Sequence, residues 1–413
     1  MNSYGFGLTV CLSAVLWGSS SAQEATEVLM TDSGVQIVTI GPGAPPHTIG
    51  LQGHRQVITM DTGARIYGLR YGVALDPNDP KAAIPGEGYI GMPQPVGCNW
   101  YAGGFFDVVL NGQSIGKTFI HSLTGRTTGN RGTTDFVFDT SQAVVRVRFV
   151  ARAGEDCLLA QVLLEPKVEI KSVRISVRCY PSAFVSHAGR HVLTSKRDLA
   201  QGERADLNVA DEWWTLYYDD VYDAGCVSAQ HTGAGPCAVL WLPAQTEKAG
   251  FNVGGYGIDT VFQLQPELRD FRFVFFDYAG KTNDVAKADL RKRAPALLDE
   301  LADFAFTDPL LARWPLAEKQ AEVEQVLALV PDDKHAAAQY ARWAKELAAQ
   351  LELVRSHSAG AILADSHRAK RVEASILKVN GADIDYRRHL PIQEDFHRLA
   401  DRIHYKHQVV PLF

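Results

Sequence analysis

The sequence has few features that would support metal–thiolate, nucleotide or nucleic-acid chemistry. Its 413 residues include only six cysteines, and none of them has the CxxC spacing of a zinc or redox site. It contains no GxGxxG, GxxxxGK[ST], GxSxG or HExxH motif and no basic run, and its 41 basic residues are outnumbered by 47 acidic ones. These absences disfavour serine-hydrolase and zincin sites, and we expect no cofactor, no bound metal and no nucleic-acid partner.

Glycine is nearly absent from the C-terminal third of the chain. Of the 35 glycines, 33 lie at or before Gly280, and only Gly360 and Gly381 follow. The two parts therefore need different architectures. We predict a β-rich antiparallel sandwich domain over residues 28–280, followed by an all-α C-terminal region over residues 283–413.

The first part has the pattern of short strands. Residues 144–150, 158–164, 173–177 and 271–276 either alternate between apolar and polar side chains or are continuously apolar. Turn residues such as Asn111-Gly112 separate these runs, which is typical of an antiparallel sandwich or barrel.

The second part is rich in Ala, Leu, Glu, Lys and Arg, which favour helices. We expect one helix over 286–306 with a break at Pro295, a second that begins at Pro315 and ends at Pro331-Asp332-Asp333, a third that begins there and runs to about 356, and a fourth over 359–379. Residues 321–349 resemble one tetratricopeptide unit. Because a single copy cannot bury its own face, a helical hairpin or coiled coil is the simpler prediction.

The N-terminus has the pattern of a secretory signal. Residues 6–17 are uncharged and mostly apolar, and the small residues Ser20 and Ala22 predict cleavage before Gln23. No Lys or Arg precedes the apolar run, so a short membrane anchor is the alternative, although about a dozen apolar residues are too few to cross a bilayer comfortably. We predict a signal peptide over 1–22, a periplasmic or secreted mature protein, and no membrane span after cleavage.

Removal of residues 1–22 would leave an odd number of cysteines. Cys226 and Cys237 close a short loop and are the easiest pair to join, while Cys157 and Cys179 lie in apolar runs typical of buried thiols.

The most unusual segment is the aromatic and acidic run 211–223. In a strand over 212–218, Trp214, Leu216 and Tyr218 form the more apolar face, which we expect to be buried. Trp213 and Tyr217 would then lie on the opposite face beside Asp211. Aromatic rings flanked by carboxylates suit sugars, whose C–H faces stack while their hydroxyls form hydrogen bonds. The alternative is that both faces are buried.

A second group of candidates is basic. His187, Arg190 and His191 are close in sequence, and we expect a loop in which they face a polar or anionic substrate. An extended strand would separate the two histidines by roughly 13 Å, too far for one metal ion. His231 lies between Cys226 and Cys237. A plain surface histidine pair is the competing interpretation.

Two loops rich in glycine supply further candidates for binding. The segment 91–104 carries Trp100 and Tyr101, and the segment 124–132 carries Arg126, which suits an oxyanion. A hairpin tip is the simpler interpretation of the second loop. Glu212 and Asp211 are adjacent acids whose side chains diverge on a strand, so their spacing does not identify a glycosidase mechanism.

The segment Val144 to Phe184 resembles consecutive strands of the galactose-mutarotase-like supersandwich, and the resemblance extends over about residues 28–280. It implies a fold whose members bind or process carbohydrates with histidines and carboxylates on a concave sheet. In this chain His187, His191, His231, Asp211 and Glu212 are the residues available for such roles. Trp100, Tyr101, Arg126, Arg190, Trp213 and Tyr217 would bind the saccharide.

Two functions remain open at this point. The first is an exported carbohydrate-binding or carbohydrate-processing protein that uses acid–base chemistry if it is an enzyme. The second is a non-catalytic envelope protein whose C-terminal helices bind a protein partner. Catalysis requires an acid and a base that converge in space, whereas a structural module would have buried aromatics and scattered histidines.

Overall fold

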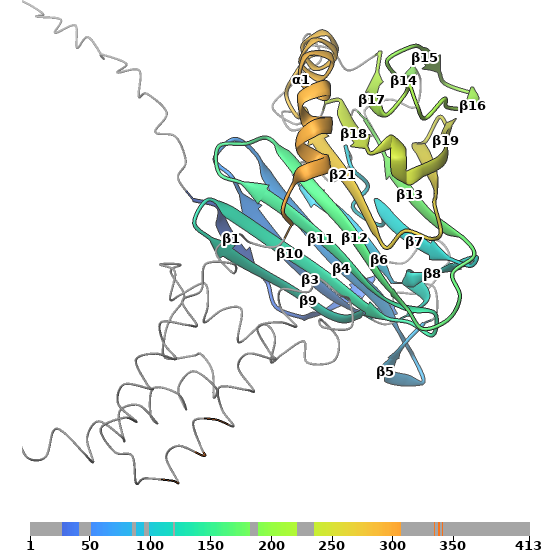
Figure 1. Ribbon diagram of the computed structural model, residues 1–413. Coiled ribbons are helices and arrows are strands. Elements are labelled where there is room, and N and C mark those ends of the chain that lie inside the picture. The colour runs from blue at the N-terminus through green and yellow to red at the C-terminus, as the bar shows by residue number, and fades with distance from the viewer. Residues whose placement is uncertain are drawn as a thin grey trace, which may run out of the picture.

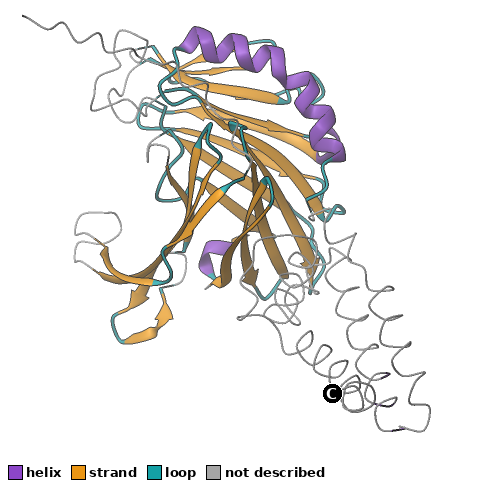
Figure 2. Ribbon diagram, turned by 90° about the vertical axis from the view of Figure 1, so that its left-hand side faces the viewer, coloured by secondary structure: helices purple, strands orange, loops and turns teal. Residues whose placement is uncertain are grey.

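Two antiparallel sheets pack face to face, and one long helix lies on the outer side of the second sheet (Figures 1 and 2). The computed structural model describes residues 27–40, 51–84, 88–94, 99–118, 120–181, 189–220 and 235–306, together with Lys334, Ala338 and Ala341. The antiparallel sandwich predicted from the sequence is confirmed. The predicted signal peptide and most of the predicted helical region lie outside the described residues.

The first sheet has twelve strands, and its central order is β1-β3-β4-β6-β7-β13-β20-β19-β16. Strands β2, β5 and β8 pair with β3, β4 and β7. The bounds are β1 Leu29–Asp32, β2 Gln36–Ile40, β3 Leu51–Asp61, β4 Ile66–Asp76, β5 Asp79–Ala83, β6 Tyr89–Gln94, β7 Phe106–Leu110, β8 Gln113–Ser114, β13 Val173–Cys179, β16 Arg204–Asp206, β19 Thr246–Val253 and β20 Ile258–Leu264.

The second sheet has nine strands in the order β15-β14-β17-β18-β21-β12-β11-β10-β9. Two short 3-10 helices, η1 (Ile115–Lys117) and η3 (Pro243–Gln245), lie in connections. The strand bounds are β9 Ile120–Thr128, β10 Arg131–Asp139, β11 Ala143–Arg152, β12 Cys157–Pro166, β14 Arg190–Leu193, β15 Asp198–Ala200, β17 Trp214–Asp219, β18 Cys237–Trp241 and β21 Asp270–Asp277.

Local sequence explains several of these strands. The four runs predicted as strands fall within β11, β12, β13 and β21. The predicted turn at Asn111-Gly112 joins β7 to β8, and both of its residues have positive φ (46° and 81°), as a tight hairpin turn requires. Asn and Gly adopt this conformation at low cost, which is why that dipeptide predicts the turn.

The main core lies between the sheets and is rich in aromatic side chains. Trp100 has no exposed surface, and its ring lies edge-on to Tyr217 and Phe275 with centroids 5.9 and 5.2 Å away. Phe105 and Phe149 extend the same cluster. Such edge-to-face pairs add to the stabilisation that burial of the rings provides.

The helix α1 (Asn283–Asp303) builds a second core on the outer side of the nine-stranded sheet. The Thr282 side chain accepts a hydrogen bond from the Val285 amide and begins the helix. Ala286, Leu290 and Ala294 repeat at intervals of four residues and are buried against β17, β18 and β21. The helix continues through Pro295, so the break considered there is absent. No helix among the described residues is long and apolar enough to cross a membrane.

Candidate functional site

The described residues that flank segments 95–98, 182–188 and 221–234 lie at one end of the sandwich, which we call the loop end. The three segments themselves lie outside the described residues. The flanks are joined by hydrogen bonds, since the Asp220 amide donates to the Gly189 carbonyl (2.8 Å) and the Tyr180 amide donates to the Asn99 carbonyl (3.1 Å).

Asn99 is the buried centre of the loop end. Its carbonyl accepts hydrogen bonds from the Tyr180 amide and from Cys237 Sγ, and its Oδ1 accepts from the Gly235 amide at 3.2 Å. Its Nδ2 donates to Asp277 Oδ1 at 3.1 Å. Asn99 thereby joins the ends of both sheets.

The carboxyl group of Asp277 lies in the interior beside Asn99. Burial raises the pKa of Asp277 to about 7, although the charge of Arg65 and hydrogen bonds from Asn99 and the Ala279 amide lower it in part. Its Oδ2 has no hydrogen-bond partner among the described residues. Asp277 therefore titrates near neutral pH at the base of the loop end.

An acid–base cluster lies on the outer side of the nine-stranded sheet at this end. His191 on β14 has its Nδ1 3.2 Å from Asp198 Oδ1 and its Nε2 2.9 Å from Asp220 Oδ2. Tyr218 stacks on the imidazole at 4.7 Å and donates a hydrogen bond of 2.6 Å to Asp198 Oδ2. Lys287 of α1 places its Nζ 3.8 Å from the centre of the Tyr218 ring.

Strand pairing brings the side chains of His191, Asp198, Tyr218 and Asp220 together. His191 lies opposite Tyr218 on β17 and opposite Ala200 on β15. The short strand β14 therefore pairs with both of these strands. Because both ring nitrogens face carboxylates, only the doubly protonated imidazolium can donate to both of them. Burial and the hydrogen bond to Asp198 raise the pKa of Tyr218, which keeps its hydroxyl protonated. The Asp220 side chain is 60% exposed and that of Asp198 is 40% exposed.

The outer side of the twelve-stranded sheet carries a tyrosine ridge at the same end, formed by Tyr101, Tyr180 and Tyr256. Tyr180 is buried, and its ring lies 4.5 Å from that of Tyr101 and 4.7 Å from that of Tyr256, which is 58% exposed. Gly257 makes this packing possible, because a Cβ there would lie 2.4 Å from the Tyr180 ring. Arg190 contributes by donating to the carbonyls of Gly255 and Pro181.

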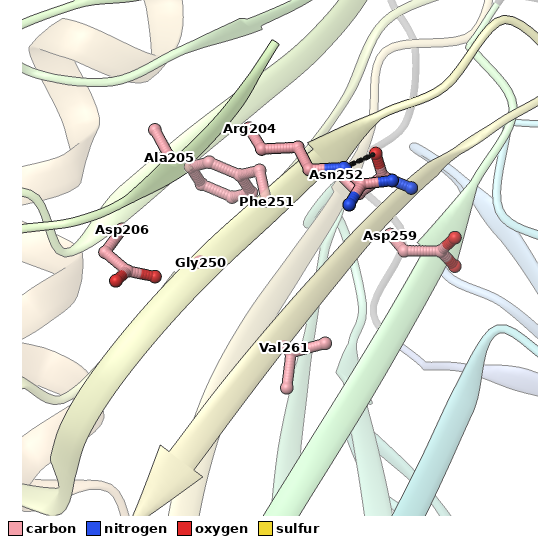
Figure 3. A pocket seen from close by; sticks show the side chains of 8 residues that line it. All are labelled: Arg204, Ala205, Asp206, Gly250, Phe251, Asn252, Asp259 and Val261. Carbon is pink, nitrogen blue, oxygen red and sulfur yellow. Dashed lines mark hydrogen bonds between the residues drawn. The ribbon is translucent and has the colours of Figure 1, made fainter. Parts of the chain in front are cut away.

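A hollow of about 460 Å³ lies near the tyrosine ridge. Figure 3 shows the residues that line it. Arg178, whose guanidinium lies 5.8 Å from the centre of the Tyr101 ring, pairs with Asp259 at 2.6 Å on the rim. Arg204 donates to Asn252 Oδ1 at 3.1 Å, and Gly250 keeps the space beside Asp206 open. The hollow is lined by Arg204, Ala205, Asp206, Gly250, Phe251, Asn252, Asp259 and Val261.

Several side chains predicted to bind a saccharide lie in the interior. The expectation that Tyr217 lies on an open face is wrong, because Tyr217 is fully buried between the sheets while Trp214, Leu216 and Tyr218 are buried under α1. Both faces of this strand are covered, which was the alternative. Trp100 and Arg190 also have no exposed surface, and Trp213 is partly buried between the two cores.

The two adjacent acids of this segment have separate roles. Glu212 is buried and accepts hydrogen bonds from Arg197 Nη2 (2.8 Å) and Thr194 Oγ1 (2.6 Å). Burial alone would raise its pKa, but these bonds and one from the Asn208 amide outweigh that effect and lower it. Asp211 is exposed and accepts from Asn208 Nδ2. Neither belongs to the acid–base cluster.

The remaining predicted residues are dispersed. Tyr101 is partly exposed on the tyrosine ridge, whereas Arg126 lies on β9 and pairs with Asp135. His187 and His231 lie outside the described residues. Cys237 is a free buried thiol, so Cys226 and Cys237, the pair easiest to join, are not bonded, and Cys157 and Cys179 are buried thiols as predicted.

Sequence reasoning missed the partners of both sites. Asp198 and Asp220 are 7 and 29 residues from His191 in sequence, and they meet it through the pairing of β14 with β15 and β17. Tyr256 lies in the glycine-rich turn Gly254-Gly255-Tyr256-Gly257, and that composition is the one signal that could have identified it. Among the described residues, no group of three or more His, Cys, Asp or Glu side chains is arranged to hold a metal ion.

Comparisons with known proteins give similarity of fold only. No family model matches the sequence, and no curated protein matches it. A Klebsiella pneumoniae protein provisionally assigned as an aldose 1-epimerase has 8% identity and a TM-score of 0.35, over 66% of this chain and 96% of that chain. An α-N-acetylgalactosaminidase from Bifidobacterium bifidum has 9% identity and a TM-score of 0.35, over 71% and 42%.

The galactosidase domain of an α-galactosidase–sucrose kinase has 9% identity and a TM-score of 0.33, over 54% of this chain and 40% of that chain. This chain therefore spans about two fifths of the length of the two glycosidases. The strand pattern predicted a weak, fold-level resemblance to sandwich proteins that act on carbohydrates, and the likeness to these solved structures stays at that level, with TM-scores of 0.30 to 0.35.

Proposed function

We propose that the protein binds carbohydrate at the tyrosine ridge and the adjoining hollow. The observation that carries the proposal is the exposed ring of Tyr256, held against the buried Tyr180 and followed by the Arg178–Asp259 ion pair on the rim of the hollow. A fixed aromatic face stacks on the C–H face of a sugar at low entropic cost, and neighbouring charged groups hydrogen-bond to its hydroxyls.

The test is calorimetric titration of the protein with a panel of neutral and uronate-containing oligosaccharides. We expect Tyr256→Ala to weaken binding about tenfold, because loss of one aromatic contact costs on the order of 1.4 kcal/mol. Val168→Ala is the matched control, since Val168 is also exposed (48%) and lies outside the ridge and the hollow. Equal affinity of Tyr256→Ala and the parent protein, or no binding to any oligosaccharide, would contradict the proposal.

A second candidate function is acid–base processing of a saccharide by the acid–base cluster. It rests on the position of His191 between Asp198 and Asp220, a geometry able to accept and return a proton. Mutarotation-like proton transfer and lyase elimination are the reactions that need only such groups.

The reaction products distinguish elimination, hydrolysis and mutarotation. Unsaturated fragments in mass spectra indicate elimination, water-added fragments indicate hydrolysis, and anomer exchange in NMR spectra indicates mutarotation. His191→Asn should abolish the activity, whereas His121→Asn, at an exposed position on β9, should retain it. An unchanged rate in His191→Asn would remove the cluster from the mechanism.

Export to the periplasm or the extracellular space is also part of the proposal, because residues 6–22 have the pattern of a cleavable signal. Fusion of residues 1–30 to a reporter that is active only after export should give an active reporter, with Gln23 as the new N-terminus. The alternative of a non-catalytic envelope protein that binds a partner through its C-terminal helices would gain support if no saccharide bound or changed.

A further inference from the structure

Two of the buried cysteines lie on facing sheets at the loop end. Cys179 is the last residue of β13 in the twelve-stranded sheet, and Cys237 is the first residue of β18 in the nine-stranded sheet. Both are free thiols with 1% and 0% of their surface exposed, and both belong to the core between the sheets. Strands that are far apart in the chain therefore bring two thiols into one interior.

The alternation along each strand explains why both side chains point inward. On β13, Val177 and Cys179 are buried in the central core, while Arg178 between them is exposed on the outer face. On β18, Cys237 and Val239 occupy the same core, two residues apart. The direction of each cysteine is therefore set by the register of its strand.

The carbonyl oxygen of Asn99 is the point at which the two cysteines approach each other. It accepts a hydrogen bond from Cys237 Sγ at 3.2 Å and another from the amide of Tyr180, the residue after Cys179, at 3.1 Å. Trp100, the residue after Asn99, pairs with Cys179 in an isolated antiparallel bridge. The peptide group that follows Cys179 and the sulfur of Cys237 thus contact the same oxygen atom.

The two thiols also form a hydrogen bond with each other. Burial raises the pKa of the Cys237 thiol, and the hydrogen bond with Cys179 raises it further. Because the thiolate is the form that reacts with oxidants, the folded protein protects this pair in its reduced state. Oxidation is therefore fastest while the chain folds and the thiols are still accessible.

The third free cysteine has different surroundings. Cys157 on β12 belongs to the second core, under α1, and its Sγ lies 3.6 Å from Glu155 Oε2. It is as deeply buried as Cys179, with 1% exposed surface, but it lies on the opposite side of the nine-stranded sheet from the Cys179–Cys237 pair. Cys157 therefore supplies a matched control.

We propose that Cys179 and Cys237 form a disulfide bond that joins the two sheets when the protein folds in an oxidising compartment. The bond closes the chain around β14, β15, β16 and β17, and with them around His191, Asp198 and Asp220 of the acid–base cluster. In the cell the proposal rests on the export proposed above, because exported proteins fold among disulfide oxidants.

The oxidant is a disulfide, and oxidised glutathione is the probe for it. The thiolate of one cysteine attacks a glutathione sulfur and releases one glutathione thiolate, and the second cysteine thiolate then attacks the protein sulfur of the mixed disulfide and releases the other. Two protein thiols and one oxidised glutathione thus give one protein disulfide and two reduced glutathiones. Two electrons pass to glutathione, and its sulfurs take up the two thiol protons.

Refolding of the full-length protein tests the pair. The chain is unfolded and reduced, refolded in a glutathione redox buffer, alkylated in denaturant and digested, and linked peptides are identified by mass spectrometry. We expect a peptide that joins Cys179 to Cys237, and Cys157 in its alkylated form. The oxidised protein should unfold at a temperature about 10 °C above that of the reduced protein, because the bond closes a long loop of the unfolded chain.

Two variants make the assignment specific. Cys179→Ala and Cys157→Ala each replace a buried cysteine by a small apolar residue. The difference in unfolding temperature between oxidised and reduced protein should vanish in Cys179→Ala and persist in Cys157→Ala. Mapping of the linked peptides in the parent protein decides the pairing independently of how well either variant folds.

Three results would overturn the proposal. They are recovery of both Cys179 and Cys237 as alkylated thiols after refolding, a bond from Cys237 to Cys98 or Cys226, and an equal gain in unfolding temperature in both variants. Because the buffer supplies the oxidant, each of these results bears on the disulfide alone, whereas the reporter fusion described above tests export alone.

Discussion

The outer faces of the two sheets carry the same kind of residues in different surroundings. On the twelve-stranded sheet, Arg178 pairs with Asp259 at 2.6 Å, and their side chains are 46% and 35% exposed. On the nine-stranded sheet, Arg148 pairs with Asp135 at 2.7 Å, and their side chains are 5% and 4% exposed. In both strands the arginine alternates with buried apolar residues. Alternation therefore identifies the side of a strand that faces away from the central core, but it does not tell whether water or protein lies on that side.

Two buried carboxyl groups extend the comparison. Asp135 is surrounded by arginines, and its pKa is lowered, whereas Asp277 has an amide partner and a more distant Arg65, and its pKa is raised to about 7. Equal burial thus accompanies pKa shifts of opposite sign, because the charge of the neighbouring groups decides whether the ionised or the protonated carboxyl group is favoured.

The largest expected effect is that of Asp135→Ala. Removal of this carboxylate leaves Arg126 and Arg148 without their shared partner, and we expect a loss of about 3–5 kcal/mol in the free energy of unfolding. Asp139→Ala on the same strand is the control, because Asp139 pairs with Lys167 at the surface and its loss should cost less than about 1 kcal/mol. Urea denaturation measures both, and equal losses would remove the distinction between the buried and exposed pairs.

An intermediate effect is expected from Asp277→Asn, and it depends on pH. Folded Asp277 keeps its proton up to about pH 7, whereas the unfolded carboxyl releases it near its ordinary value of 3.8. The stability contributed by this group is therefore complete below about pH 4 and is lost as the pH rises towards 7, by about 2–3 kcal/mol between pH 5 and pH 8.

The Asn side chain cannot ionise, so Asp277→Asn should lose less stability than the parent protein between pH 5 and pH 8. Thermal unfolding at a series of pH values measures the difference. Parallel stability curves for the two proteins would show that Asp277 does not titrate in this interval.

The smallest expected effect is that of Arg178→Gln on stability. The Arg178–Asp259 pair is exposed to water, and its loss should change the free energy of unfolding by less than about 1 kcal/mol. Saccharide affinity should fall in the same variant, since Arg178 lies between the tyrosine ridge and the hollow. A loss of stability as large as that of Asp135→Ala would mean that the two outer faces do not differ as described.

The strands were the most predictable part of the fold. Val144–Val150 and Leu158–Leu164 are recognisable because their apolar residues are local and continuous, and Asn111-Gly112 specifies its own turn. The candidate sites were less predictable. His191 could be singled out, but its partners come from β15, from β17 and from the residue after β17, and strand pairing is not encoded in any local run. Tyr217 was wrongly expected to be exposed. Its strand is buried on both faces, because α1, which begins only at Asn283, covers the face opposite Tyr217.

By itself, the sequence determined where strands and turns form, where glycine ceases and α1 follows, and which side of each strand is apolar, because these properties depend on neighbouring residues. The tertiary structure alone decided that Trp100, Arg190 and Tyr217 are buried, that Tyr256 is exposed beside a hollow, and that His191 lies between two carboxylates. The physical reason is that burial and pairing of a side chain depend on the elements that pack against it, and those elements come from distant parts of the chain.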